Sequence, residues 1–278
     1  MLKDKEELLH QARLTANKMR KNILLMTHRA KGGHPGGCLS ATDLLAVLYK
    51  CFMRIDPQKP NWPGRDYFFL SKGHSVPALY AILIEMGFLS EGEVEDFREM
   101  EGRLPAYPSC EDTPGIDMAS GSLGQGLSVA NGAALAAKLN GTDQRAYVLL
   151  GDGELHEGQI WEAAMTAAHY KLNNVCAIVD YNKLQLDGSV EEVKSLGDLK
   201  AKWESFNWHV LEIDGHDYEQ IYQAFVEAEQ YRKGPSVLIA HTVKGKGVSF
   251  MEGEAGWHCA APTDEELTKA LKELSRVC

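Results

Sequence analysis

The sequence has few of the features that mark membrane, nucleic-acid-binding or disulfide-rich proteins. No stretch approaches the ~20 consecutive apolar residues of a membrane-spanning helix, and residues 1–26 are charged and helical in period, unlike a signal peptide. Lysines and arginines form no run, and a formal net charge of −10 opposes nucleic-acid binding. The six cysteines include no CxxC pair and no metal-ligand spacing. We therefore expect a protein of a reducing, cytoplasmic compartment that binds neither membrane nor nucleic acid.

The second half of the chain has regularly alternating strand and helix patterns. Such alternation predicts an α/β fold, with a mostly parallel sheet and helices on both faces. No internal repeat, low-complexity tract or linker interrupts it, so we expect one domain, residues 1–278. The expected strands are 145–150, 175–180, 208–213 and 235–241, and the expected helices are 157–171, 197–205, 217–231 and 264–275.

The first half is less regular. Apolar residues at steps of three and four predict a helix over 5–29. Ser40 and Asp43 form an N-cap signature for a helix that ends at Phe52. The remaining expectations are a strand at 66–70, a helix at 75–86, an irregular lid or loop at 88–118, and a helix after Gly121.

Two oxygen-bearing side chains, Asp152 and Asn182, each follow a short apolar strand. A right-handed crossover between these strands makes them parallel, so both residues should lie at the carboxyl edge of the sheet, where such sheets bind ligands. A carboxylate and an amide suit Mg²⁺, which completes its coordination with phosphate and water oxygens. Gly151 and Gly153 would let a phosphate approach the backbone closely. The alternative is an ordinary loop aspartate that caps the next helix.

The stretch around these two residues carries a family resemblance. A GDG followed about thirty residues later by an Asn after an apolar strand resembles the thiamine diphosphate signature, and GDGELHEGQIWEA with DYNKLQLDG resembles transketolases. The resemblance implies the thiamine diphosphate-binding fold. It also implies that Asp152, Asn182 and the backbone carbonyl of Leu184 bind Mg²⁺, for which Ca²⁺ or Mn²⁺ can substitute, and that Gly153 contacts the cofactor.

Three histidines stand in glycine- or aromatic-flanked turns: His34, His74 and His258. A lone loop histidine is usually solvated or caps a helix, but imidazole can also donate to phosphate or sugar oxygens and exchange protons near neutral pH. The resemblance places His34 and His74 on the reacting carbons of a ketose, with His74 also near the cofactor. It places His258 at the diphosphate and a donor hydroxyl, and implies proton and hydroxyl handling for all three.

Two further segments gain a role from the resemblance. Lys244, in HTVKGKG, could be a surface lysine, but similarity to one transketolase subgroup places it at the cofactor diphosphate, with Lys246 the weaker candidate. The turn GSLGQG, residues 121–126, has the wrong spacing for a dinucleotide fingerprint. The resemblance assigns contacts with the aminopyrimidine ring to part of this turn, and close helix packing by its glycines is compatible with that role. The residues concerned are Gly121, Ser122 and Leu123.

The chain departs from the family pattern at two positions. Tyr107 stands where most transketolases have a donor-site histidine, and a tyrosine can hydrogen-bond but carries protons poorly at pH 7. We therefore expect a reshaped donor pocket. Gly37 stands where relatives often have a serine, which removes one hydroxyl near the cofactor.

The family also implies a second polypeptide. In transketolases the glutamate that activates the aminopyrimidine comes from the following, pyrimidine-binding domain of another chain, and no such domain is evident in these 278 residues. We expect the diphosphate-binding subunit of a split transketolase, active only with a C-terminal partner subunit in an α₂β₂ assembly. Glu157 would lie at that interface; alternatively, it is simply an acidic residue in the first turn of a helix.

The expected activity is transfer of a two-carbon ketol unit between sugar phosphates, as in pentose phosphate metabolism, through thiamine diphosphate. Three alternatives stay open at this point. They are a deoxyxylulose-phosphate synthase type of enzyme, a non-catalytic thiamine diphosphate-binding or regulatory subunit, and a Mg²⁺-dependent phosphohydrolase. A phosphohydrolase should have a nucleophilic aspartate or a second cluster of metal ligands, and Asp152 has no such neighbours in sequence.

Overall fold

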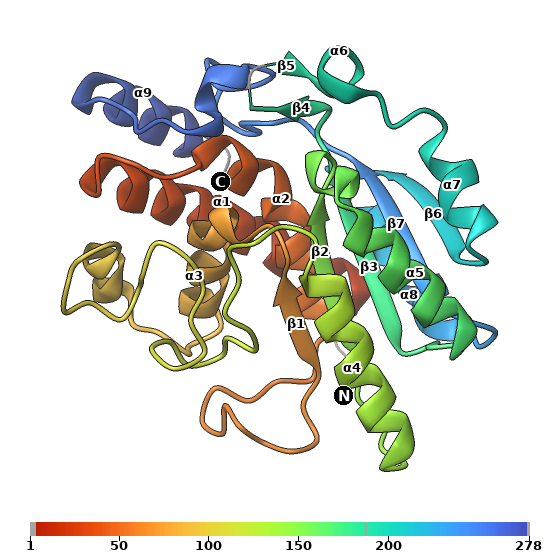
Figure 1. Cartoon of the computed structure of the whole chain (residues 1–278). Helices are drawn as coiled ribbons and strands as arrows, with labels where there is room; N and C mark the ends of the chain where they lie inside the picture. The colour runs from red at the N-terminus through yellow and green to blue at the C-terminus, as the bar shows by residue number, and fades with distance from the viewer. Residues whose placement is uncertain (1–3, 187, 277–278) are drawn as a thin grey trace.

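The protein is described by a computed structural model that covers residues 4–186 and 188–276; both ends of the expected domain, including Cys278, and Asp187 lie outside the described residues. Within these ranges, five parallel strands form one sheet in the order β1–β2–β3–β7–β6 (Figure 1). The predicted parallel α/β fold is confirmed. The strands are β1 Tyr67–Leu70, β2 Ala146–Gly151, β3 Val175–Tyr181, β6 His209–Asp214 and β7 Ser236–His241.

The strand register brings the ends of β2 and β3 together. Gly151 pairs with Asp180, and the helix α5 (Gly158–His169) connects the two strands. Because parallel strands end at the same edge of a sheet, the residues that follow β1, β2, β3 and β7 all meet at the carboxyl edge.

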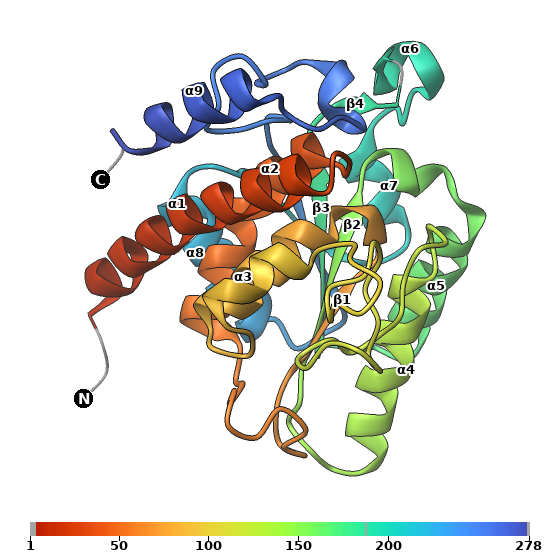
Figure 2. The ribbon, with the colours of Figure 1, turned by 90° about the vertical axis from the view of Figure 1, so that its left-hand side faces the viewer.

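Helices cover both faces of the sheet, as the strand side chains require. Along β2, Tyr147 and Leu149 belong to one buried apolar cluster, whereas Val148 and Leu150 belong to the other. Figure 2 shows the two layers on opposite sides of the sheet. The first cluster is covered by α1 Lys5–Arg29, α2 Pro35–Val47, α3 Val76–Glu85, α8 Tyr218–Gln230 and α9 Asp264–Leu274; the second is covered by α4 Gly126–Leu139, α5 and α7 Leu199–Ser205. No helix in the described ranges is long and apolar enough to cross a membrane.

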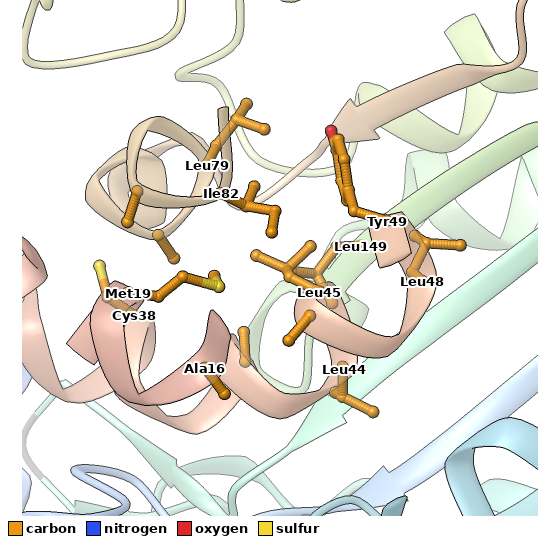
Figure 3. Close-up of a cluster of buried hydrophobic side chains, with 14 of the residues drawn as sticks. Ala16, Met19, Cys38, Leu44, Leu45, Leu48, Tyr49, Leu79, Ile82 and Leu149 are labelled. Carbon is orange, nitrogen blue, oxygen red and sulfur yellow. The ribbon is translucent and has the colours of Figure 1, made fainter. Parts of the chain in front are cut away.

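The helix α2 is buried along its whole length, and this fixes the position of its N-terminus. Figure 3 shows Cys38 and Leu45 of α2 packed with Met19 of α1 and Leu149 of β2. A helix apolar on all sides belongs in a protein core. The residue that precedes α2, His34, is therefore held by the core.

The prediction that Ser40 caps this helix is wrong. The helix α2 begins at Pro35, five residues earlier, because proline is well suited to the first helical position. Glycine at position 36 fits there because a Cβ would lie 2.8 Å from the carbonyl oxygen of Trp257. The Ser40 hydroxyl instead donates to Asp180 across the sheet edge, and Asp43 binds Arg20.

The other elements are short. The helix expected after Gly121 begins at Gly126, as α4, and the irregular segment 88–118 contains one 3₁₀ helix. A hairpin and a short helix follow Asn182 that the sequence patterns did not predict. These elements are η1 Leu48–Phe52, η2 Gly73–Ser75, η3 Glu91–Asp96, η4 Gly153–His156, β4 Leu184–Gln185, β5 Gly188–Ser189, α6 Val190–Lys194 and η5 Ala255–His258.

Candidate active site

A cavity of about 400 Å³ lies at the carboxyl edge of the sheet. The ends of β1, β2, β3 and β7 form it together with the N-terminus of α2, η5 and the turn before α4. All the predicted site residues except Ser122 line this cavity. They are His34, His74, Tyr107, Gly121, Leu123, Asp152, Gly153, Glu157, Asn182, Leu184, Lys244 and His258.

Three oxygen donors lie together on one side of the cavity. The Asp152 carboxylate is buried and accepts hydrogen bonds from the backbone N–H groups of Gly153 (2.7 Å) and Lys183 (2.6 Å). The Asn182 side-chain oxygen accepts from the N–H of Leu184 (3.1 Å), which shapes the turn into β4. Among the described residues, no three His, Cys, Asp or Glu side chains gather to bind a metal. The donors available are a carboxylate, an amide oxygen and a backbone carbonyl, and this all-oxygen set fits a hard cation such as Mg²⁺.

The electrostatics around Asp152 also favour a cation. Burial, together with the nearby charge of Asp180, raises the pKa of Asp152 to about 6, although two backbone hydrogen bonds act in the opposite direction. Burial of a carboxylate next to another carboxylate is unfavourable. A divalent cation bound here would offset that repulsion.

The three histidines, far apart in the sequence, form a triangle. The ring centroid of His34 lies 4.9 Å from that of His74 and 5.4 Å from that of His258, and the His74 and His258 centroids are 5.4 Å apart. Burial lowers the pKa of His74 to about 2, with Lys72 the next cause. Burial and Lys244 lower the pKa of His258 to about 4, and burial with Arg98 lowers that of His34. All three rings are therefore neutral at pH 7, so each can both donate and accept a hydrogen bond.

Lys244 joins the oxygen donors to this triangle. Its ammonium donates to the backbone oxygen of Leu184 (3.2 Å) and lies 3.0 Å from Nδ1 of His258. An ammonium can only donate, so Nδ1 of His258 accepts and the proton of the neutral ring is on Nε2. Lys244 is 2% exposed, and burial lowers its pKa to about 8. The possibility of an ordinary surface lysine is thereby excluded.

Tyr107 and Gly37 have packing surroundings that suit them. The Tyr107 ring is half exposed in the cavity, and a Cβ at Gly121 would lie 3.6 Å from it, in ordinary contact. At Gly37, a Cβ would lie 3.2 Å from the Ser75 hydroxyl, so a serine there would need its neighbour to shift. Both departures from the family pattern are accommodated by this structure.

A buried ion pair that was not predicted from the sequence lies below the cavity. Lys72, which follows β1, pairs with Asp180 at the end of β3 and donates to the Gly37 backbone oxygen (2.9 Å). Burial raises the pKa of Asp180, but Lys72 and the hydroxyl donors Ser40 and Thr242 outweigh that effect and lower it. The available signal was that both residues stand next to predicted strand ends. Their pairing was not predictable, because 108 residues separate them.

Glu157 lies at the rim of the cavity, at the N-cap position of α5, where its side chain makes no capping hydrogen bond. Its side chain packs against the preceding turn, where a Cβ on Gly124 would lie 2.8 Å from that of Glu157. The helix-terminus role considered for Glu157 therefore leaves its carboxylate available to other groups.

Comparison with known proteins identifies this arrangement. Residues 11–275 match the family described as "Transketolase, thiamine diphosphate binding domain". One of the two subunits of the apulose-4-phosphate transketolase of Phocaeicola vulgatus is 45% identical over 262 residues, which cover 94% of this chain and 93% of that protein. The 6-deoxy-6-sulfo-D-fructose transketolase subunit SqwG of a Clostridium species is 43% identical over 270 residues, covering 97% of each.

The fold comparison agrees. The crystal structure of transketolase from Campylobacter jejuni superposes with a TM-score of 0.89 at 33% identity, covering 97% of this chain but 43% of that one. The chain thus spans less than half of the solved transketolase and nearly the whole of the subunits named above. It belongs to the transketolase family, as one of the subunits that carry the thiamine diphosphate-binding domain.

Proposed function

We propose that this transketolase subunit holds the diphosphate of thiamine diphosphate through a divalent cation and transfers a two-carbon ketol unit between sugar phosphates together with a C-terminal partner subunit. One observation carries the proposal. The oxygen donors Asp152, Asn182 and Leu184, the ammonium of Lys244 and the histidine triangle all line one cavity. Such a cavity offers a cation site and proton-handling groups within one ligand length of each other.

The cofactor site divides into a tail end and a ring end. Asp152, Asn182 and the Leu184 carbonyl would hold Mg²⁺, or Ca²⁺ or Mn²⁺ in its place, with Lys244 beside the diphosphate and Gly153 contacting it. Gly121, Ser122 and Leu123 would contact the aminopyrimidine ring. When bound, thiamine diphosphate supplies a nucleophilic carbon and an electron sink. The protein supplies the binding groups and their orientation.

The histidines handle protons and hydroxyls of the sugar. His34 and His74 are neutral and would hydrogen-bond the hydroxyls on the reacting carbons, with His74 also beside the cofactor. His258 accepts a hydrogen bond from Lys244, so its Nε2–H is free to donate to a donor hydroxyl or a diphosphate oxygen. Neutral imidazoles suit this task because each can take a proton at one nitrogen while giving one at the other.

A partner subunit is part of the proposal. Two relatives are named as subunits of transketolases, and the solved transketolase chain is more than twice as long as the part matched here. We infer that residues 1–278 form one domain, that the assembly is α₂β₂, and that Glu157 faces the carboxylate of the partner which activates the cofactor. The described cysteines are all unpaired, which supports a reducing, cytoplasmic location.

The substrate class is a ketose phosphate or a close analogue. The relatives' names specify apulose-4-phosphate and 6-deoxy-6-sulfo-D-fructose, so this branch of the family is not restricted to the pentose phosphate sugars. Tyr107 lines the donor side of the cavity in place of a histidine and would help to set that choice. A deoxyxylulose-phosphate synthase gains no support from these relatives. A non-catalytic subunit would not need the complete histidine triangle.

The test is reconstitution. The chain would be purified with and without the product of the adjacent gene, and ketol transfer from several ketose phosphates would be assayed with thiamine diphosphate and Mg²⁺. We expect activity only for the mixture. Activity of this chain alone would contradict the split-enzyme proposal, and inactivity of the mixture with every donor would contradict the assigned reaction.

A further inference from the structure

Glu154 is a buried carboxylate of the GDGE segment that has no role in the proposed reaction. Its residue is 2% exposed at the floor of the cavity. One carboxylate oxygen accepts the N–H of Gly124 (2.8 Å), and the other accepts the N–H of Gly151 (2.9 Å). Glu154 thus joins the turn before α4 to the end of β2 through a single side chain.

Ser71 completes the connection. Its hydroxyl donates to the same Glu154 oxygen that accepts from Gly124, and it accepts the N–H of Gly126 (3.1 Å). The turn also approaches Ser71 very closely, since a Cβ at Gly126 would lie 2.5 Å from that of Ser71. Two backbone N–H groups of the 121–126 turn are therefore held by the Glu154–Ser71 pair, which is anchored to the ends of β1 and β2.

We propose that Glu154 and Ser71 are positioning residues that set the distance between the ring end and the tail end of the cofactor site. The inference rests on the proposed function, in which the turn at 121–123 contacts the aminopyrimidine ring and Asp152 holds the metal and diphosphate. Asp152 lies between Gly151 and the helix η4 that carries Glu154. The pair therefore fixes the turn relative to the residue that anchors the cofactor tail.

Only a carboxylate satisfies this set of donors. Three donors converge on Glu154, namely the N–H groups of Gly124 and Gly151 and the Ser71 hydroxyl, and a carboxylate accepts at both oxygens. A glutamine of the same shape has one oxygen and one amide NH₂, so its NH₂ group must face an N–H donor. A buried donor without an acceptor is costly. The turn would then move away from the strand ends.

The experiment compares two probes on the complex of this chain with its partner subunit. The first probe is thiamine diphosphate with Mg²⁺, and the second is inorganic diphosphate with Mg²⁺, which occupies the tail end alone. Dissociation constants would be measured by calorimetry for wild type, Glu154→Gln and Ser71→Ala, with Glu204→Gln on the exposed face of α7 as the matched control. Melting temperatures would be recorded alongside.

For Glu154→Gln we expect thiamine diphosphate to bind roughly tenfold to a hundredfold more weakly, as for other residues that orient a ligand-binding group, while the affinity for inorganic diphosphate changes less than about twofold. Ser71→Ala should give a smaller loss of the same kind, and it tests the inference independently if Glu154→Gln does not fold. Glu204→Gln should change neither affinity.

Other outcomes would overturn the inference in distinguishable ways. Equal weakening of both probes, or unchanged affinity for both, would mean that Glu154 and Ser71 have only a structural role. Failure of the wild-type complex to bind either probe would overturn the proposed cofactor site itself, and the positioning role with it.

Discussion

Asp43 is a buried carboxylate whose removal should both unfold the protein more easily and loosen the loop that carries Lys244. Its side chain accepts hydrogen bonds from Nη2 of Arg20 (2.7 Å), Nδ1 of His216 (2.8 Å) and the hydroxyl of Tyr218. The other nitrogen of His216, Nε2, accepts the N–H of Val243 (2.8 Å), so the ring proton is on Nδ1 and points at Asp43. The cluster thus ties α1 and α2 to the segment after β7.

The substitution Asp43→Asn should cost about 3–5 kcal/mol of unfolding free energy, because it leaves the guanidinium of Arg20 buried without a counter-charge. Arg20 is 8% exposed, so water cannot replace the lost partner. Asparagine can accept with one oxygen only, and its NH₂ group would face donors. Against a total stability of about 5–15 kcal/mol this is a large loss, and it corresponds to a melting temperature lower by roughly 6–20 °C.

Urea and thermal denaturation of the purified chain would measure the effect. The matched control is Asp264→Asn, which removes the partner of His28 in an exposed pair and should cost less than about 1 kcal/mol. In the double variant Arg20→Met, Asp43→Asn the unpaired charge is gone, so about 1 kcal/mol or more should be recovered relative to the sum of the single variants. A cost below about 1 kcal/mol for Asp43→Asn, or strict additivity in the cycle, would refute the reasoning.

The same residue predicts a pH dependence. Burial raises the pKa of Asp43, but the charge of Arg20 and the hydrogen bonds from His216, Arg20 and Tyr218 outweigh it and hold the pKa well below its ordinary value. A depressed folded-state pKa gives stability that is present above the unfolded pKa, about 4, and is lost as the pH falls below it. The stability difference between wild type and Asp43→Asn should therefore be constant from pH 6 to 8 and shrink below about pH 4. A difference that grew on acidification would contradict the assignment.

Three further predictions concern the cavity. Asp152→Ala should abolish Mg²⁺-dependent binding of thiamine diphosphate in calorimetry, whereas Glu204→Ala should not; retained binding would mean that the metal ligand is misassigned. Lys244→Met should weaken binding of Mg²⁺–diphosphate by roughly tenfold, with a smaller dependence on salt, because a buried cation is removed from the diphosphate side. An unchanged affinity would place Lys244 outside the site. Tyr107→His should shift the donor profile of the reconstituted enzyme toward ketose phosphates, and an unaltered profile would make Tyr107 incidental.

How much the sequence could predict varied with the kind of pattern. The strands β2, β3 and β7 and the helix α1 were predicted to within a residue or two, because their apolar periodicity is local. The start of α2 was missed because a helix buried on all sides has no polar face to mark it, and its glycines and proline resemble a loop. The hairpin of β4 and β5 was missed because each strand is two residues long.

The sequence by itself determined the chemistry available to this protein. The oxygen donors Asp152 and Asn182 stand after apolar strands, and a parallel sheet must bring such residues to one edge. The resemblance to transketolases added their roles.

Only the tertiary structure decided which groups act on one another. His34, His74 and His258 form one triangle, Lys244 donates to the Leu184 carbonyl, and Glu154 meets Ser71 across 83 residues of chain. Local periodicity encodes which face of an element is buried, but contacts between distant segments depend on how those faces pack. The same packing buries these groups, and burial is the largest cause of the lowered pKa values of the histidines and of Lys244.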